Sequence, residues 1–308
     1  MDISEYQAKA RLTDRSNKQP WIGLTQNALG LTTKVGKLAG ILKKKIRDGV
    51  SYQTFTKDAR IQMGQALWYL TTLASHLNMN LDEIAQENLA FHEERWATLG
   101  DGQRQLFSHL LDGSYSLEEQ IPRQFTARFE LREGPNSTSW LPIVQVWIDG
   151  VPFGDPIDDN IGTEDFYRLH DVLHIAHAAI LGWSPVLRKL LGRKRKSRPE
   201  VDKFQDGARA RDTEEALARL IRSEAKRNNY YAGVSAIDTP FLIKVQSLVA
   251  DLEVGVRQAG EWQHCILEAY RVFRLLKENS GGYIDVSLPE RSLSFDVLPT
   301  FKEQGSAD

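Results

Sequence analysis

Residues 24–46 have the sequence LTQNALGLTTKVGKLAGILKKKI, and this stretch decides the fold expected for the first third of the chain. Its apolar side chains recur at intervals close to 3.6 residues, the period of an amphipathic α-helix. Gly49 follows shortly after, and glycine is common at the C-terminal end of a helix. The same spacing predicts helices at 2–12, 57–77 and 81–96. We therefore expect residues 1–98 to form a helical bundle in which the apolar stripes pack together.

The composition indicates a folded chain without a strong charge bias. The 308 residues, 41% of them hydrophobic, suffice for about two domains with packed cores, and the net charge is -2. The single cysteine, Cys265, excludes an internal disulfide and a cysteine-rich zinc site. The first six residues are polar, unlike a secretory signal, and no run of about 18 apolar residues occurs. These features predict a cytoplasmic protein without a membrane partner.

The pattern changes near a Leu-Gly-Asp-Gly segment at 99–102. Two runs at 124–131 and 141–148 have the alternation of β-strands, and a Gly-Pro-Asn-Ser turn at 134–137 lies between them. The helical spacing returns further on. The helices expected in this half are 103–111, 163–181, 184–191, 213–228, 240–259 and 261–279, and a short strand is expected at 283–294. The predicted fold is mainly α: a helical bundle (1–98) followed by a helical domain (99–308) with a small β-hairpin insertion, an α+β arrangement.

Three segments of the first domain carry a resemblance to a known family. LGLTTKVGK at 29–37, QMGQALWYL at 62–70 and LDEIAQENL at 81–89 resemble, in order and spacing, the motif regions of the MazG-like nucleoside triphosphate pyrophosphohydrolases. The resemblance covers about residues 1–98. It implies a helical fold, a tendency to form dimers and a magnesium-dependent attack of water on a triphosphate.

The acidic residues that such enzymes use to hold magnesium are replaced here. The family has Glu-Glu-x-x-Glu on one helix and Glu-x-x-Asp on the next, and carboxylates are the ligands that magnesium prefers. The matching positions in this chain hold Thr33, Lys34, Lys37, Gln62 and Gln65. At the third motif Asn88 is kept, but Phe91 stands where the family usually has lysine. Magnesium binding is therefore not expected in the first domain, which we predict to be inactive as a pyrophosphohydrolase.

Two interpretations of this first domain remain open. In one, Lys34 and Lys37, helped by the lysines at 43–45, bind phosphates without a metal. In the other, these lysines are solvated and the domain is an oligomerisation scaffold. Both are compatible with a homo-oligomer assembled through the bundle.

The segment DFYRLHDVLHIAH at 165–177 has the strongest chemical character. His170, His174 and His177 are four and three residues apart, so they share one face of a helix. Histidines on adjacent turns can bind one metal ion, with a third ligand supplied from elsewhere. The best donors are Glu214 and Glu215, with Asp206 a further candidate. The alternative is a buried hydrogen-bond network without a metal.

From these residues we predict a catalytic group and a metal site. The catalytic group is His170, Asp171, His174, Glu214 and Glu215, and the ligands of a divalent metal of unspecified identity are His170, His174 and Glu214.

A basic cluster follows the histidine motif. Arginine and lysine at this density can hold phosphates, although a solvated loop is the common alternative. The predicted phosphate contacts in this half are Arg193, Lys194, Arg195, Lys196, Arg209 and Arg211. GxxxxGK[ST], GxGxxG and Gly-x-Ser-x-Gly motifs are absent, so the sequence does not indicate a P-loop, a Rossmann site or a hydrolase elbow.

The second half also resembles the domain found C-terminal to MazG-like modules in some bacterial and phage proteins. The resemblance is carried by YRLHDVLH at 167–174, LGWSP at 181–185, RKRKS at 193–197 and DGARAR at 206–211. The predicted function is a nucleotide-handling protein whose C-terminal domain is a candidate metal-dependent hydrolase acting on a nucleotide. The alternative is a non-enzymatic nucleotide sensor or interaction module, in a phage-defence setting. Nucleic acid stays open as a partner, but no motif supports it.

Overall fold

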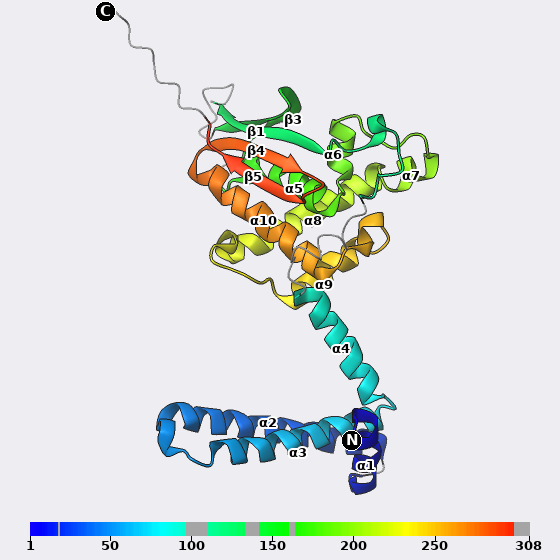
Figure 1. The fold of residues 1–308 in the computed structure, drawn as a ribbon, viewed down its shortest axis with the longest axis vertical. Helices are drawn as coiled ribbons and strands as arrows, with labels where there is room; N and C mark the ends of the chain where they lie inside the picture. Colours follow the sequence, from blue (N-terminus) through cyan, green and yellow to red (C-terminus); the bar gives the residue numbers. More distant parts are fainter. Residues whose placement is uncertain (18, 97–109, 133–141, 160–163, 299–308) are drawn as a thin grey trace, which may run out of the picture. The chain divides into compact units, whose positions relative to one another are not determined.

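The computed structural model describes residues 1–17, 19–96, 110–132, 142–159 and 164–298. The chain forms two compact units, Met1–Glu93 and Glu94–Asp308. Figure 1 shows the helices of the first unit in blue and cyan, and the sheet and helices of the second in green to red. The expected helix at 103–111 and the turn at 134–137 lie outside the described residues, apart from positions 110 and 111.

The first unit consists of helices, as the sequence predicted. A 3-10 turn, Gly49–Ser51, connects the two long helices, which pack against each other as a hairpin, and the short first helix packs on the second of the pair. Four helices begin in this unit: α1 Ile3–Thr13, α2 Pro20–Asp48, α3 Phe55–His76 and α4 Leu81–Trp96.

The first unit buries few large apolar side chains. Asn27 and Thr72 are buried between α2 and α3 and bond to each other, with Thr72 Oγ1 donating to Asn27 Oδ1 at 3.1 Å. Large side chains such as Leu29, Val35 and Ile46 on α2 are instead exposed. The apolar stripes that predicted the helices are therefore left partly uncovered within this unit.

The second unit is built around a five-stranded antiparallel sheet in the order β3-β2-β1-β4-β5. The central strand β1 pairs with β2 on one side and with β4, some 150 residues later in the chain, on the other. The strands are β1 Gln124–Arg132, β2 Ile143–Ile148, β3 Val151–Ile157, β4 Gly281–Ser287 and β5 Ser292–Asp296.

The sheet corrects the expectation of a small hairpin insertion. The first two runs are strands, but they form one side of a sheet that the end of the chain completes. Strand β3 resembles a loop in sequence because it contains Pro152, Gly154 and Pro156, which are tolerated in a strand at the edge of a sheet. The pair Gly281 and Gly282 begins β4, and a Cβ at Gly282 would lie 2.3 Å from the Phe295 ring.

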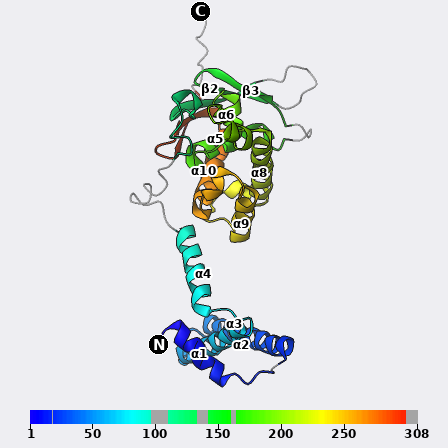
Figure 2. The same cartoon turned by 90° about the vertical axis from the view of Figure 1, so that its right-hand side faces the viewer.

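The helices of the second unit support the sheet from one face. Helices α5 and α10 contact β4 and β5, and α8 lies beside α5 and α9 (Figures 1 and 2). The helices are α5 Asp171–Leu181, α6 Pro185–Leu190, α7 Pro199–Phe204, α8 Ala208–Arg227, α9 Thr239–Leu248 and α10 Ala259–Glu278. The expected helix 240–259 is two elements, α9 and a 3-10 turn Glu253–Val256. None of the helices in the described ranges combines the length and the apolar character needed to cross a membrane.

Candidate functional site

Helix α5 places the predicted histidines in the interior of the second unit. The expected helix 163–181 begins only at Asp171, because Phe166 has a left-handed backbone (φ 58°) and a 3-10 turn, Tyr167–Leu169, follows it. All eleven residues of α5 are buried between the sheet, α10 and α8. The helix ends at Gly182, which has a left-handed conformation (φ 66°), as the sequence predicted.

His170 lies at the start of α5 with one ring nitrogen already fixed. Its Nδ1 is 3.0 Å from the carbonyl oxygen of Tyr167, and its ring stacks on the Tyr167 ring with centroids 4.4 Å apart. A carbonyl oxygen only accepts, so Nδ1 carries the proton. Burial lowers the pKa of His170, which favours the neutral ring with an unprotonated Nε2. That Nε2 lies 3.6 Å from Asp171 Oδ1.

Glu214 is the centre of a buried hydrogen-bond network. Its Oε1 lies 2.9 Å from His174 Nδ1, 3.1 Å from His177 Nδ1 and 2.8 Å from Ser184 Oγ. Its Oε2 accepts from the backbone N–H of Val186 at 2.9 Å. Burial alone would raise the pKa of Glu214, but the His174 charge and the hydrogen bonds lower it to about 2. Glu214 is therefore an ionised acceptor that is occupied by protein donors.

The network fixes the tautomer of His174. An ionised carboxylate only accepts hydrogen bonds, so His174 Nδ1 holds its proton toward Glu214. The opposite nitrogen, Nε2, is buried without a hydrogen-bond partner and lies 3.4 Å from Glu215 Oε1. Burial opposes a charge on His174, but Glu214 and Glu215 outweigh it and raise the pKa of the ring well above its ordinary value. His174 thus presents one nitrogen to either a proton or a cation.

Among the residues that the structure describes, two groups of three bring ligand atoms within 4.8 Å of one another: His170, His174 and Glu215, and His174, His177 and Glu214. In the second group Glu214 is fully occupied and all three side chains are 0% exposed, so water does not reach it. In the first group the Glu215 side chain is 33% exposed and the His170 side chain 11%, which leaves access from solvent. The first group fits a metal centre better.

Two of the three predicted metal ligands, His170 and His174, lie in the first group. The third, Glu214, is replaced there by its neighbour Glu215. His170 and His174 lie together as expected. Glu214 contacts His174 Nδ1, whereas Glu215 faces His174 Nε2. Asp171, also predicted, is buried beside His170. His177 belongs to the buried side of the network, where its ring lies near Trp183 and Trp262.

Two supporting residues of this site were not predicted from the sequence. Tyr167 holds the His170 ring in place by its carbonyl and by stacking. Ser184 caps α6 by accepting from the N–H of Leu187 at 3.0 Å, as predicted, and it also donates to Glu214. The Gly-Trp-Ser-Pro motif signals only the helix corner, so the second role of Ser184 could not be read from it.

The family model of the MazG C-terminal domain matches residues 107–299. The chain belongs to this family. His170, His174 and Glu215, called the histidine–glutamate group below, lie inside the match. Residues 1–98 lie before it, so their MazG-like resemblance stays a prediction. Membership in the MazG C-terminal domain family indicates a MazG-related function associated with nucleotides.

One curated relative is the gene 37 protein of Mycobacterium phage L5. It is 35% identical to this chain over 69 residues, which are 22% of the chain and 60% of the phage protein. The chain thus spans about 60% of the length of that relative. No solved structure matches the chain.

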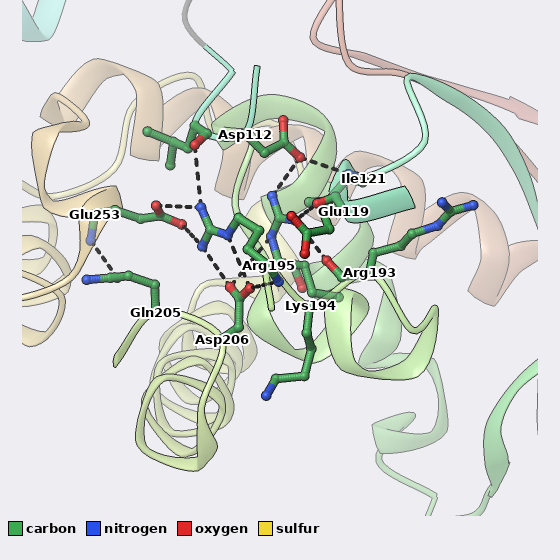
Figure 3. A network of polar contacts seen from close by, with 12 residues as sticks. Asp112, Glu119, Ile121, Arg193, Lys194, Arg195, Gln205, Asp206 and Glu253 are labelled. Atoms are coloured by element: carbon green, nitrogen blue, oxygen red, sulfur yellow. Dashed lines mark hydrogen bonds and ion pairs between the residues drawn. The ribbon is translucent and has the colours of Figure 1, made fainter. Parts of the chain in front are cut away.

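Part of the basic cluster of this MazG C-terminal domain forms buried ion pairs within the domain (Figure 3). Arg195 is buried, and its guanidinium binds Asp206 at 2.7 Å and Glu253 at 2.6 Å. Burial opposes the charge, but these two carboxylates raise the pKa of Arg195 above its ordinary value. Asp206, considered as a metal ligand, is therefore committed to Arg195 and to the loop that carries it.

The other residues of the predicted phosphate-binding group are more accessible. Arg193 donates to the carbonyl of Leu117 at 3.1 Å, and Lys194 forms an ion pair with Asp202. The remaining members in this domain are exposed or half-buried: Lys196, Arg209 and Arg211. Lys34 is half-buried and Lys37 exposed on α2, in the other compact unit. Phosphate binding by these accessible residues stays a prediction.

Proposed function

We propose that the MazG C-terminal domain of this chain is a metal-dependent hydrolase acting on a phosphate group of a nucleotide. The observation that carries the proposal is the buried Nε2 of His174, which has no hydrogen bond within normal distance and faces Glu215 at 3.4 Å while Glu214 holds the opposite nitrogen. A buried polar atom without a partner costs about 1–3 kcal/mol, so a ligand for this atom accounts for its position.

The donor set fits a divalent metal. Two imidazole nitrogens, from His170 and His174, and one carboxylate, from Glu215, make a three-ligand group that leaves a further position open for water or substrate. Both imidazoles have their Nδ1 hydrogen-bonded to an oxygen acceptor, the arrangement that orients histidine ligands of metals. When bound, the metal would supply Lewis-acid polarisation of a phosphoryl oxygen and a lowered pKa for its water.

Asp171 is placed to handle the proton of that reaction. Its carboxylate lies 3.6 Å from His170 Nε2. Burial raises the pKa of Asp171, which makes it a better proton acceptor near neutral pH than an ordinary aspartate. We assign it the role of general base toward an attacking water. Glu214 acts through His174 by fixing its orientation.

The alternative role for the same residues is structural. Without a metal, a protonated His174 would lie between Glu214 and Glu215 as a buried ion pair. This alternative explains the contact to Glu214, but it leaves Nε2 and Glu215 at 3.4 Å, longer than a good charge-assisted hydrogen bond. A non-catalytic nucleotide sensor would use the same site for binding without turnover.

The test is turnover by the full chain. Purified protein, supplied with zinc or manganese, is incubated with nucleoside mono-, di- and triphosphates, and the products are separated by chromatography. We expect Glu215→Gln to lower turnover by at least about 100-fold, because it replaces an anionic ligand. Glu200→Gln, at an exposed position on α7, is the matched control and should behave like the wild type.

Two results would overturn the proposal. If the wild type binds nucleotides but releases no product with any metal, the site is that of a sensor. If Glu215→Gln and Glu200→Gln turn over substrate equally, the reaction takes place elsewhere in the chain.

A further inference from the structure

A basic groove lies on the same helix as Glu215, beginning about one turn further along. It has a volume of about 480 Å³ and is lined by Tyr167, Arg219, Arg222, Ser223, Lys226 and Arg227. All but Tyr167 belong to α8, which Figure 2 shows running beside α5. The pattern of charged residues at 219, 222 and 226 is one that the sequence reasoning passed over.

Tyr167 connects the groove to the histidine–glutamate group. The Tyr167 ring stacks on His170, and the Arg222 guanidinium lies 5.3 Å from the centroid of the same ring. Glu215 and Arg219 are four residues apart on α8, so their side chains lie on the same face of the helix. A molecule with one end at Glu215 would therefore reach Arg219 without leaving this surface.

The groove carries more positive charge than its own ion pairs neutralise. Asp165 pairs with Arg222 and lies 3.7 Å from Lys226, and Glu224 lies 3.4 Å from Arg227. Arg219 is exposed, and within the described part of the chain no carboxylate lies within ion-pair distance of it. Four cations therefore line this groove against the carboxylates of Asp165 and Glu224, with Glu215 one turn away, and the remaining positive charge favours an anionic ligand.

One of these cations is held in place before any ligand arrives. Arg222 contacts the Asp165 carboxylate and also donates to the Asp165 carbonyl oxygen at 2.9 Å. A guanidinium fixed in this way loses little conformational freedom on binding, which is the benefit of preorganisation. Asp165 itself is fixed by the Tyr167 N–H, which donates to it at 3.1 Å.

We propose that this groove binds the polyphosphate chain of a nucleotide whose reacting phosphoryl group lies at His170, His174 and Glu215. This assignment rests on the proposed function and adds the substrate class to it. The eleven helical steps from Glu215 to Lys226 span about 16 Å of helix, enough for two or more phosphates in a row. A monophosphate would contact only part of this row of cations, whereas a chain of phosphates reaches from Arg219 to Lys226.

The test is a calorimetric titration of inorganic tripolyphosphate into the full chain, freed of metal with a chelator that is then removed. We expect Arg219→Glu to weaken binding by at least about tenfold, since it replaces a charge-assisted contact with repulsion. Lys244→Glu, which makes the same charge change at an exposed position on α9, should leave binding unchanged. Arg219 is exposed, so both variants should keep the wild-type melting temperature.

Three outcomes would overturn the assignment: no binding by the wild type, equal binding by the two variants, or binding of a single-stranded oligonucleotide that tripolyphosphate does not displace. Because this titration contains no metal, it is independent of turnover. Groove binding without hydrolysis would contradict only the proposed reaction. Hydrolysis that requires Glu215 but is insensitive to Arg219→Glu would contradict only the groove.

Discussion

At the scale of single residues, Glu214 and Glu215 show how neighbouring carboxylates acquire different roles. They are adjacent near the start of α8, so their side chains point about 100° apart around the helix. One is fully buried among four donors and the other is one-third exposed beside His174 Nε2. The sequence predicted that both would meet the histidines, but the rotation of α8 against α5 decides which one supports and which one faces the open side.

Because the two carboxylates have different roles, Glu214→Gln and Glu215→Gln should differ in their effect on stability. Glu214→Gln should lower the free energy of unfolding by about 2–5 kcal/mol, because the new amide cannot accept from all the buried donors around it. Glu215→Gln should leave the stability close to that of the wild type, because its side chain is partly solvated. Urea unfolding of both variants, with Glu200→Gln as the control, measures the difference. Equal losses of stability from the two changes would contradict the assignment.

At the scale of elements, local patterns predicted the helices well and the sheet poorly. Amphipathic stripes are complete within one helix, so α2, α3 and α10 were visible in the sequence. Strand pairing is not local: β4 becomes a strand beside β1, whose partner residues lie about 150 positions away. The two histidines were found because their spacing lies within one helix, whereas the carboxylates opposite them depended on tertiary packing.

The uncovered stripes of the first unit predict self-association. Leu67 and Leu70 on α3 are each 45% exposed and line an apolar groove of about 580 Å³ together with α1 and α4. We expect the full chain to form oligomers through this unit, because the groove leaves apolar surface in water. The double variant Leu67→Asp and Leu70→Asp should be monomeric by light scattering at micromolar concentration.

A control for this prediction is Val256→Asp, which makes the same kind of apolar-to-aspartate change at an exposed position of the second unit. It should leave the oligomeric state unchanged. A wild-type chain that is monomeric at the same concentration would contradict the prediction, as would a double variant that stays oligomeric.

At the scale of the whole molecule, the chain combines a helical unit with exposed apolar stripes and a MazG C-terminal domain with a buried polar centre. The domain keeps its ionisable groups in ordered networks: Arg195 with Asp206 and Glu253, and His174 with Glu214. The first network stabilises the loop that the sequence suggested for phosphate binding. The second leads to His174 Nε2, which faces Glu215, and the basic groove on α8 is bordered by Tyr167, whose ring stacks on His170.

The most direct test of this account is a crystal structure of the full chain grown with zinc or manganese, with anomalous diffraction recorded at the absorption edge of the metal. We predict an anomalous-difference peak at about 2.0–2.2 Å from His170 Nε2, His174 Nε2 and a Glu215 oxygen. Glu214 should still be bonded to His174 Nδ1. A metal bound instead by Glu214 and His177, or a His174 Nε2 bonded only to Glu215 in the presence of either metal, would contradict it.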